Sequence, residues 1–409
     1  MCRLLLLLVL HLNLLDLSSS EDETLVILTL SPAEEDETTR KIGVYYHCPD
    51  CAPGDVLRVA DEHQIFEKII GDPRGFLRTD LRVSPESFSD ITATILRNGE
   101  LIYSSPVIDR ANWMHDNKSI LKYLSLPQLV IPGTHQSGAY DRPETHGIWN
   151  LCQDLSIEDQ LTLGIRYIDV QPSCKRIEDQ CQSFFMEYSL LEMLPMDAVF
   201  SEIKGFLNRT NEIVILSLSD FSSEFQSDED HARFMEFIKH ELADDLFSFN
   251  TTSHGWSTPL GKIWKAEKRL IISYNYGGPV DPTFGTGVQP FWCNCQRSDD
   301  LHVFFADPQK RKNWANRKIP SVDVVELIPG WQTVVPQDSS NSAESSPPFS
   351  FKAWTEEFSP KVCEWYHEQW NATSNVVVVD FFETTGVVDL AVHWNKKRGE
   401  DTMKKITSA

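Results

Sequence analysis

A histidine and two aspartates stand close to the ends of apolar segments, where chemically active side chains often occur. His135 comes just after one such segment, Asp169 lies near the end of a second, and Asp380 lies near the end of the last. A carboxylate beside a histidine orients the imidazole and fixes its tautomer, so the ring can act as a general base. We therefore predict that His135 is a general base, the alternative being a purely structural histidine.

Further polar side chains occupy similar positions and could bind substrate or transfer a second proton. These residues are Gln136, Gln171, Glu187, Ser219, Asp220 and Asn275. The chain has no Gly-x-Ser-x-Gly elbow, Walker loop or dinucleotide-binding fingerprint, and no His pair with the zinc-protease spacing. The predicted chemistry therefore depends on the residues at strand ends, and no metal ligand is predicted with certainty.

From about residue 125 the apolar segments alternate with amphipathic helical patterns. Six predicted strands cover 126–133, 165–171, 183–189, 212–221, 269–275 and 375–382, and predicted helices include 156–164, 195–207, 228–246, 359–371 and one from 386. Repeated strand–helix units form parallel sheets, and this number of units favours a TIM barrel. Because a TIM barrel places its active site at the carboxyl ends of the strands, the same residues would meet at one face.

The preceding region, 21–115, has the composition of an all-β domain. Five segments rich in β-branched and aromatic residues cover 24–30, 41–48, 55–61, 91–98 and 100–108. Asn98-Gly99 between the last two segments predicts a type I′ hairpin. The predicted fold is α/β: a small β-sandwich-like domain at 21–115, followed by a barrel at 116–409.

The charge balance and the N-terminus restrict the partners and the compartment. The 409 residues carry a net charge of −23, which argues against nucleic-acid binding. A basic residue, an apolar run and small residues at 1–20 predict a cleaved signal peptide. No later segment approaches the roughly 20 apolar residues of a transmembrane helix. We expect a secreted protein.

The cysteines and glycosylation sequons agree with an oxidising compartment. Eight cysteines follow the predicted signal peptide, an even number that favours disulfides. We predict one pair, Cys174–Cys181, and read Cys48-Pro-Asp-Cys51 as a local staple or turn. Four sequons, at Asn117, Asn208, Asn250 and Asn371, predict a glycoprotein.

Several ordered motifs resemble the phosphatidylinositol-specific phospholipase C (PI-PLC) X domain, and the stand-alone X-domain proteins above all. The similarity covers about residues 122–397. The motifs are LPQLVIPGTHQSGAYD (126–141), NLCQDLSIEDQLTLGIRYIDVQPS (150–173), FSEIKGFLNRTNEIVILSLSDF (200–221), TPLGKIW (258–264) and VVVVDFFETTGVVDLAVHWN (376–395). The resemblance implies a distorted TIM barrel that meets a membrane surface transiently and cleaves inositol phospholipids or related phosphodiesters.

The resemblance also implies roles for individual residues. His135 matches the histidine that takes the proton from the attacking hydroxyl, Asp380 matches the carboxylate that orients it, and Asp169 matches an acidic residue after the second strand. Glu187 stands where the family has a second histidine, which protonates the leaving group, and Gln171 stands where it has an arginine. Gln136 stands where the family has a calcium-ligating amide, and Ser219, with Asp220 beside it, stands where the family has a carboxylate after the fourth strand.

These replacements leave alternative functions open. A phosphodiester needs a nearby cation, because its transition state gains negative charge. A weak calcium site from Asp169, Gln136, Gln171 and Asp220 could supply it, and Glu187 could be a general acid if burial raised its pKa. We predict a phosphoric diester hydrolase with altered chemistry. The alternatives are a catalytically degenerate barrel that binds a lipid headgroup or a protein, and a purely structural module.

Overall fold

The computed structural model describes residues 23–33, 38–140, 151–329 and 351–408. The chain divides into two compact units, Met1–Val107 and Ile108–Ala409. This division lies earlier than the predicted boundary after residue 115, because the short helix α2 (Trp113–Asp116) belongs to the second unit. The predicted signal peptide lies outside the described residues.

The first unit contains two antiparallel sheets that share one apolar core. One sheet has the order β1-β2-β5 and the other has the order β4-β3-β6-β7. The strands are β1 (Leu25–Leu30), β2 (Arg40–His47), β3 (Val56–Ala60), β4 (Ile65–Ile69), β5 (Arg74–Val83), β6 (Thr92–Arg97) and β7 (Glu100–Ser104). Alternate residues such as Ile42, Val44, Leu57 and Val59 enter the common core. The predicted sandwich-like fold is confirmed.

The hairpin of the first unit is confirmed, whereas two of its strands were not predicted. Asn98 and Gly99 both have positive φ, 53° and 85°, as a type I′ turn requires, and they join β6 to β7. The missed strands are β4 and β5. Both are rich in charged residues, and β4 exposes most of its side chains, so neither has a clear apolar alternation.

A parallel sheet of seven strands forms the second unit, in the order β14-β13-β9-β8-β17-β16-β15. The strands are β8 (Ile131–Thr134), β9 (Tyr167–Val170), β13 (Val214–Leu218), β14 (Leu270–Tyr274), β15 (Gln289–Phe291), β16 (Ser321–Val325) and β17 (Val376–Val379). The strands follow one another around the sheet in chain order, and the first, β8, pairs with the last, β17, as in a barrel, while β14 and β15 form the two edges of the sheet. The curled sheet is the predicted distorted barrel.

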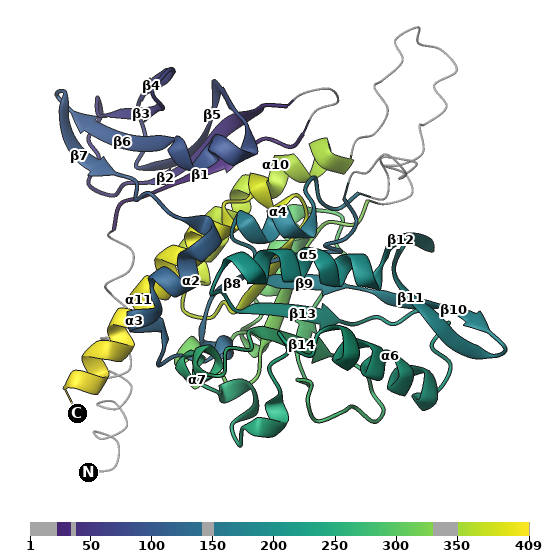
Figure 1. The fold of residues 1–409 in the computed structure, drawn as a ribbon. Coiled ribbons are helices and arrows are strands. Elements are labelled where there is room, and N and C mark those ends of the chain that lie inside the picture. The colour runs from purple at the N-terminus through teal and green to yellow at the C-terminus, as the bar shows by residue number, and fades with distance from the viewer. Residues whose placement is uncertain (1–22, 34–37, 141–150, 330–350, 409) are drawn as a thin grey trace, which may run out of the picture. The chain divides into compact units, whose positions relative to one another are not determined.

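Helices surround the strands of this sheet (Figure 1). They include α3 (Lys118–Leu121), α4 (Ile157–Thr162), α5 (Met196–Arg209), α6 (Asp228–Glu241), α7 (Leu260–Lys265), α8 (Ser298–Phe305), α10 (Phe351–Glu364) and α11 (Val387–Thr407). Ser156 begins α4 as predicted, since its side chain accepts a hydrogen bond from the Asp159 N–H at 3.1 Å. Helix α5 buries Val199, Phe200 and Ile203 on one face, which fixes it against the sheet.

The predicted third barrel strand belongs to a separate antiparallel sheet. Strands β10 (Pro172–Ile177), β11 (Gln180–Tyr188) and β12 (Leu191–Pro195) pair in sequence order, and β10 and β11 project beyond the parallel strands (Figure 1). The prediction that 183–189 is a parallel barrel strand was therefore wrong. The predicted Cys174–Cys181 disulfide joins β10 to β11 and is confirmed.

The remaining cysteines differ in state. Cys48–Cys51 and Cys293–Cys295 also form disulfides, the first of which is the predicted local staple. Cys152 and Cys363 are buried and free.

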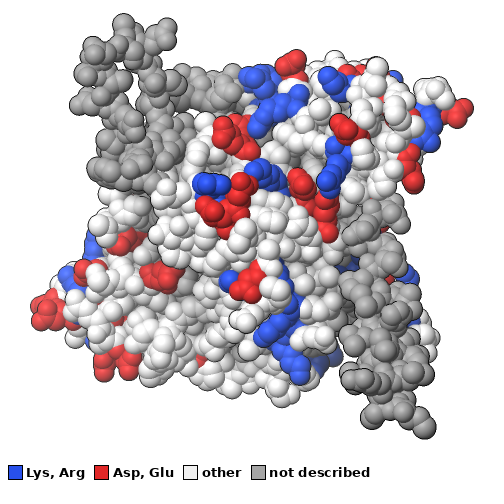
Figure 2. All heavy atoms as spheres, turned by 180° about the vertical axis from the view of Figure 1, so that it is seen from behind, with Lys and Arg blue, Asp and Glu red and all other residues white. Residues whose placement is uncertain are grey.

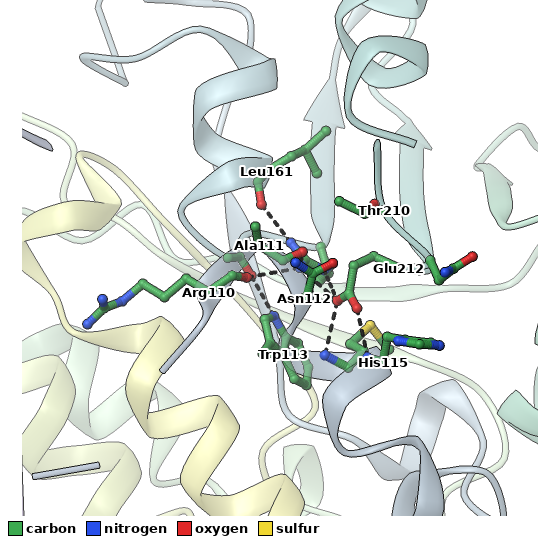
Figure 3. A network of polar contacts seen from close by, with 12 residues as sticks. Arg110, Ala111, Asn112, Trp113, His115, Leu161, Thr210 and Glu212 are labelled. Atoms are coloured by element: carbon green, nitrogen blue, oxygen red, sulfur yellow. Dashed lines mark hydrogen bonds and ion pairs between the residues drawn. The ribbon is translucent and has the colours of Figure 1, made fainter. Parts of the chain in front are cut away.

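A buried ion pair attaches the start of the second unit to the barrel (Figure 3). The side chains of Arg166 and Glu212 are 1% and 0% exposed, and an Arg166 nitrogen lies 2.7 Å from a Glu212 oxygen. Both side chains also bind the backbone of segment 110–115. Arg166 donates to the carbonyls of Arg110 and Ala111, and Glu212 accepts from the N–H groups of Met114 and His115. The pair therefore holds this segment in place with few unsatisfied charges.

Candidate active site

A cavity of about 980 Å³ opens where the parallel strands end. His135 follows β8, Asp169 is the second-last residue of β9, and Asn275 follows β14. The predicted site residues that line the cavity are His135, Gln136, Asp169, Ser219, Asp220 and Asn275. The sheet thus brings together residues that are 140 positions apart in the sequence.

The backbone is strained at three of these strand ends. Gln136, Asp220 and Phe381 have φ values of 43°, 50° and 42°, in the left-handed region that side chains other than glycine rarely adopt. Each residue directly follows a side chain of the site, namely His135, Ser219 and Asp380. Strain of this kind persists where the surrounding structure fixes the backbone, and it is common at functional sites.

His135 contacts two carboxylates through one ring nitrogen. Its Nδ1 lies 2.9 Å from Asp380 Oδ1 and 2.9 Å from Glu326 Oε2. The Asp380 side chain is only 2% exposed, whereas Glu326 lines the cavity. Asp380 does not line the cavity and instead supports His135 from behind, as the predicted orienting carboxylate would.

The two carboxylates determine the charge of His135. Burial by itself would lower the pKa of the imidazole, but Glu326 and Asp380 outweigh this effect and raise the pKa well above 6.5. The charged imidazolium is therefore the main form at neutral pH. This imidazolium places a positive charge next to the carboxylates of Glu326 and Asp380.

Asp169 lies on the cavity wall beside the strained turn. Its Oδ2 accepts a hydrogen bond from the Gln136 N–H at 3.3 Å. Burial raises the pKa of Asp169 to about 6, while the imidazolium of His135 acts in the opposite direction. Two of the predicted residues, Asp169 and Asp220, thus bring negative charge to the same cavity, and Glu326 adds a third carboxylate.

Two predicted site residues, Glu187 and Gln171, do not line the cavity. They are hydrogen-bonded to each other through the backbone, Glu187 N to Gln171 O at 2.9 Å. The neighbour Tyr188 lines the cavity instead, with its ring 6.1 Å from the His135 ring. The β11–β12 pairing shifts register between Met186 and Glu187, so one residue further along the strand takes the inward position. Glu187 is thus not placed to protonate a leaving group.

Glu326 and Trp292 are site residues that the sequence reasoning missed. Glu326 directly follows β16 and accepts a hydrogen bond from the Trp292 indole N–H. The signal was present, because segment 321–326 reads SVDVVE, a short and mostly apolar run that ends on Glu326. This run was not assigned as a strand, and so its carboxylate was not placed at a strand end.

The overall acidity of the chain does not describe every surface. On the face shown in Figure 2, basic side chains lie among acidic ones. The cavity differs, since no Lys or Arg is among the described residues that line it. Gln136 Oε1 is also buried there and has no hydrogen-bond partner in the described part of the chain. Gln136, Asp169 and Asp220 are therefore the oxygen-bearing side chains that could hold a calcium ion, without the predicted Gln171.

No helix within the described ranges has the length and apolar character needed to cross a membrane. No protein-family model matches the chain. Three curated proteins are similar over part of their sequence: the variant-surface-glycoprotein phospholipase C of Trypanosoma brucei brucei, PI-PLC X domain-containing protein 1 of Danio rerio and PI-PLC X domain-containing protein 2 of Homo sapiens. Their identities to the chain are 25%, 24% and 29%, over 46%, 49% and 42% of it.

These matches cover the relatives only in part. The chain spans 60% of the trypanosome protein, 71% of the zebrafish protein and 62% of the human protein. Two bacterial structures share the fold more completely. The phosphatidylinositol-specific phospholipase C of Listeria monocytogenes has a TM-score of 0.50 at 16% identity, over 69% of this chain and 99% of that one. A mutant of the Staphylococcus aureus enzyme gives 0.50 at 13%, over 68% and 97%.

The structural likeness concerns the fold, and the sequence likeness concerns the X-domain proteins. In sequence and in fold, the chain is therefore similar to the phosphatidylinositol-specific phospholipase C X-domain proteins, as its motifs predicted.

Proposed function

We propose that the chain is a phosphodiesterase of the PI-PLC type that acts on an inositol phospholipid or a related phosphodiester. The observation that carries the proposal is the His135–Asp380 pair, with 2.9 Å between Nδ1 and Oδ1, at the wall of a large cavity where the barrel strands end. The names of the relatives, which include phospholipase C, support the same class of reaction.

In the proposed reaction His135 accepts the proton of the attacking hydroxyl. Asp380 holds the ring through Nδ1. Both carboxylates contact Nδ1, so proton exchange with the substrate takes place at Nε2. Because Glu326 and Asp380 favour the imidazolium, the base form is a minority at neutral pH. We therefore expect slow turnover that increases toward alkaline pH.

The negative charge of a phosphodiester must also be balanced. The imidazolium of His135 supplies one positive charge before proton transfer. Gln136, Asp169 and Asp220 would hold a calcium ion, which when bound supplies further positive charge beside the phosphate. Asp169 is more than half deprotonated above a pH of about 6, so binding of the ion would weaken under acidic conditions.

A second candidate function is binding without turnover. It is favoured by the cavity wall, whose described residues include several carboxylates but no Lys or Arg. It is also favoured by the position of Glu187, which leaves no acid at the place of the family's second histidine. A neutral or cationic ligand would suit such a cavity better than a phosphate.

Turnover on phosphatidylinositol vesicles separates the two functions. The full chain would be assayed with calcium and with chelator, beside His135→Ala and the control His240→Ala, whose side chain is 84% exposed. Product release that His135→Ala abolishes and His240→Ala preserves would support the phosphodiesterase. No product from the wild-type chain under any condition, together with saturable ligand binding, would support the binding barrel.

We also propose that the protein is secreted and glycosylated. Three disulfides among the described residues suit an oxidising compartment. Asn208 and Asn250 are exposed, whereas the amides of Asn117 and Asn371 donate hydrogen bonds to backbone carbonyls. We expect glycans at Asn208 and Asn250 first, which mass spectrometry of protein recovered from culture medium would test.

A further inference from the structure

A buried thiol lies beside the catalytic pair and has no part in the proposed reaction. Cys152 is 0% exposed and is not in a disulfide. Cys152, His135 and Asp380 each offer one potential metal-ligand atom, and these three atoms lie within 4.8 Å of one another. The backbone supports this arrangement, since the Phe381 N–H donates to the Cys152 carbonyl at 2.8 Å. Thiol, imidazole and carboxylate thus converge on one point behind the cavity wall.

The polar atoms at this point are not fully satisfied by hydrogen bonds. His135 Nδ1 can carry one proton, yet it lies 2.9 Å from an oxygen of Asp380 and 2.9 Å from an oxygen of Glu326. The second oxygen of Asp380, Oδ2, is buried and receives no hydrogen bond from a nitrogen or oxygen donor of the described residues. Buried carboxylate oxygens normally have hydrogen-bond partners, and here the neighbouring side chain is the Cys152 thiol, so a cation held between thiol and carboxylate would satisfy both groups.

We propose that Cys152, His135 and Asp380 form a zinc site, with Glu326 as the fourth ligand. Zinc binds thiolate, imidazole and carboxylate with four ligands in a tetrahedron, whereas calcium and magnesium prefer oxygen alone. Bonds of roughly 2.0 to 2.3 Å keep ligand atoms within about 4.5 Å of one another. The ligand atoms of Cys152, His135 and Asp380, all within 4.8 Å of one another, therefore need only a small movement. Glu326 lies outside this group and would move toward the ion from its position 2.9 Å from His135 Nδ1.

This site is separate from the oxygen-rich group formed by Gln136, Asp169 and Asp220. It contains the only thiol among the described residues that lies in a cluster of potential metal ligands. On binding, zinc takes the place of the thiol proton of Cys152 and of the Nδ1 proton of His135, and both protons pass to the solvent. The orphan oxygen of Asp380 then gains a positive partner.

Zinc at this point would inhibit the proposed reaction. An imidazole that binds zinc through Nδ1 keeps its remaining proton on Nε2, so it cannot accept the proton of a hydroxyl. The zinc site itself does not depend on the proposed function, because its occupancy can be measured without turnover. A catalytically silent barrel would bind zinc equally well.

Cobalt spectroscopy with a matched cysteine control tests the zinc site. The full, untagged chain would be stripped with chelator and titrated with zinc and with cobalt, beside Cys152→Ser and Cys363→Ser. Cys363 is the matched control, because it is also buried and free but is not a member of the cluster. Mass spectrometry would measure zinc content, and near-ultraviolet absorption would detect thiolate-to-cobalt charge transfer.

We expect about one zinc per chain in the wild type and in Cys363→Ser, with a charge-transfer band for both. Cys152→Ser should lose the band and bind zinc more than about tenfold more weakly. Asp380→Asn, which keeps the thiol, should retain the band at weaker affinity, so it tests the site even if Cys152→Ser folds poorly. A wild-type chain without stoichiometric zinc, or with the same spectrum as Cys152→Ser, would overturn the proposal.

Discussion

Two histidines close to the barrel mouth, the half-buried His135 and the buried His231, have opposite environments. His135 lies against two carboxylates, which raise its pKa well above 6.5 despite burial. His231, in α6, is 2% exposed and lies among aromatic rings: its ring is stacked 3.5 Å from that of Tyr276, and its Nδ1 is 2.9 Å from the Tyr274 hydroxyl. Burial lowers the pKa of His231 to about 4, although Asp228 and Asp230 act in the opposite direction.

The difference shows what makes a histidine available for chemistry in this barrel. Both rings are largely removed from solvent, so burial alone does not distinguish them. The carboxylates at 2.9 Å from His135 favour its charged form, whereas His231 has no carboxylate of the described residues in such contact and burial keeps it neutral. His231 is therefore part of the packing, and His135 is the histidine for which we propose a chemical role.

The largest effect expected from this comparison is the loss of turnover in His135→Ala. Removal of a general base reduces rates by roughly 10²- to 10⁴-fold. His231→Phe preserves the stacking on Tyr276 and should leave turnover close to that of the wild type. Initial rates on phosphatidylinositol vesicles would measure both variants. Equal losses in the two variants would contradict the assignment of roles.

The next effect concerns stability at acidic pH. The pKa of His231 is about 4 in the folded chain, and a free histidine titrates near 6.5, so the unfolded chain binds the proton first as the pH falls. Stability should therefore decrease below pH 6.5, and His231 should account for about 2 kcal/mol of the loss at pH 5.

Denaturant unfolding at pH 7 and pH 5 would measure this loss. His231→Phe should show a smaller difference between the two pH values than the wild type. The exposed His240, as His240→Phe, is the matched control and should behave like the wild type. If the wild type and His231→Phe lost the same free energy of unfolding between pH 7 and pH 5, burial would not lower the pKa of His231 in the folded chain.

A smaller effect should come from a second histidine next to His135. Tyr188→His places an imidazole on the cavity wall, where the family has its proton donor, and should raise turnover by roughly tenfold. Glu187→His, one residue earlier on β11, points away from the cavity and should not. The same vesicle assay would compare the two. The reverse order would mean that the strand has a different register in solution.

The smallest effect is a change in the titration of His135 itself. In Glu326→Gln one of the two carboxylates that raise the His135 pKa is lost, so the pKa should move down while that of His231 stays in place. Histidine NMR of chelator-treated protein would follow both rings. An unchanged midpoint for His135 would indicate that Asp380 alone sets its charge.

The sequence predicted the barrel and the half of the site that lies on regular parallel strands. His135, Asp169 and Asp380 come from short apolar strands whose ends are visible as a change to polar residues. Asp220 and Asn275 follow the same rule on β13 and β14. Each of these positions depends only on where a strand ends, and the end of an apolar run in the sequence marks that residue.

The other half of the site depends on pairing, which a single sequence does not reveal. Tyr188 took the position predicted for Glu187, because a register shift in β11 reverses the inward side of the strand. Glu326 was missed because β16, only five residues long, was not assigned. Such details are determined by hydrogen bonds to neighbouring strands rather than by local composition.

The buried pair of Arg166 and Glu212 decides how the chain can be divided. A barrel that began at residue 116 would lack segment 110–115 and would leave both charges short of partners in the interior. The two charges would still pair with each other, but a buried group that loses its hydrogen-bond partner costs about 1 to 3 kcal/mol, a large share of the stability of a typical domain. A portable form of the barrel therefore includes segment 110–115, which the sequence had assigned to the β domain and which belongs to the second unit, Ile108–Ala409.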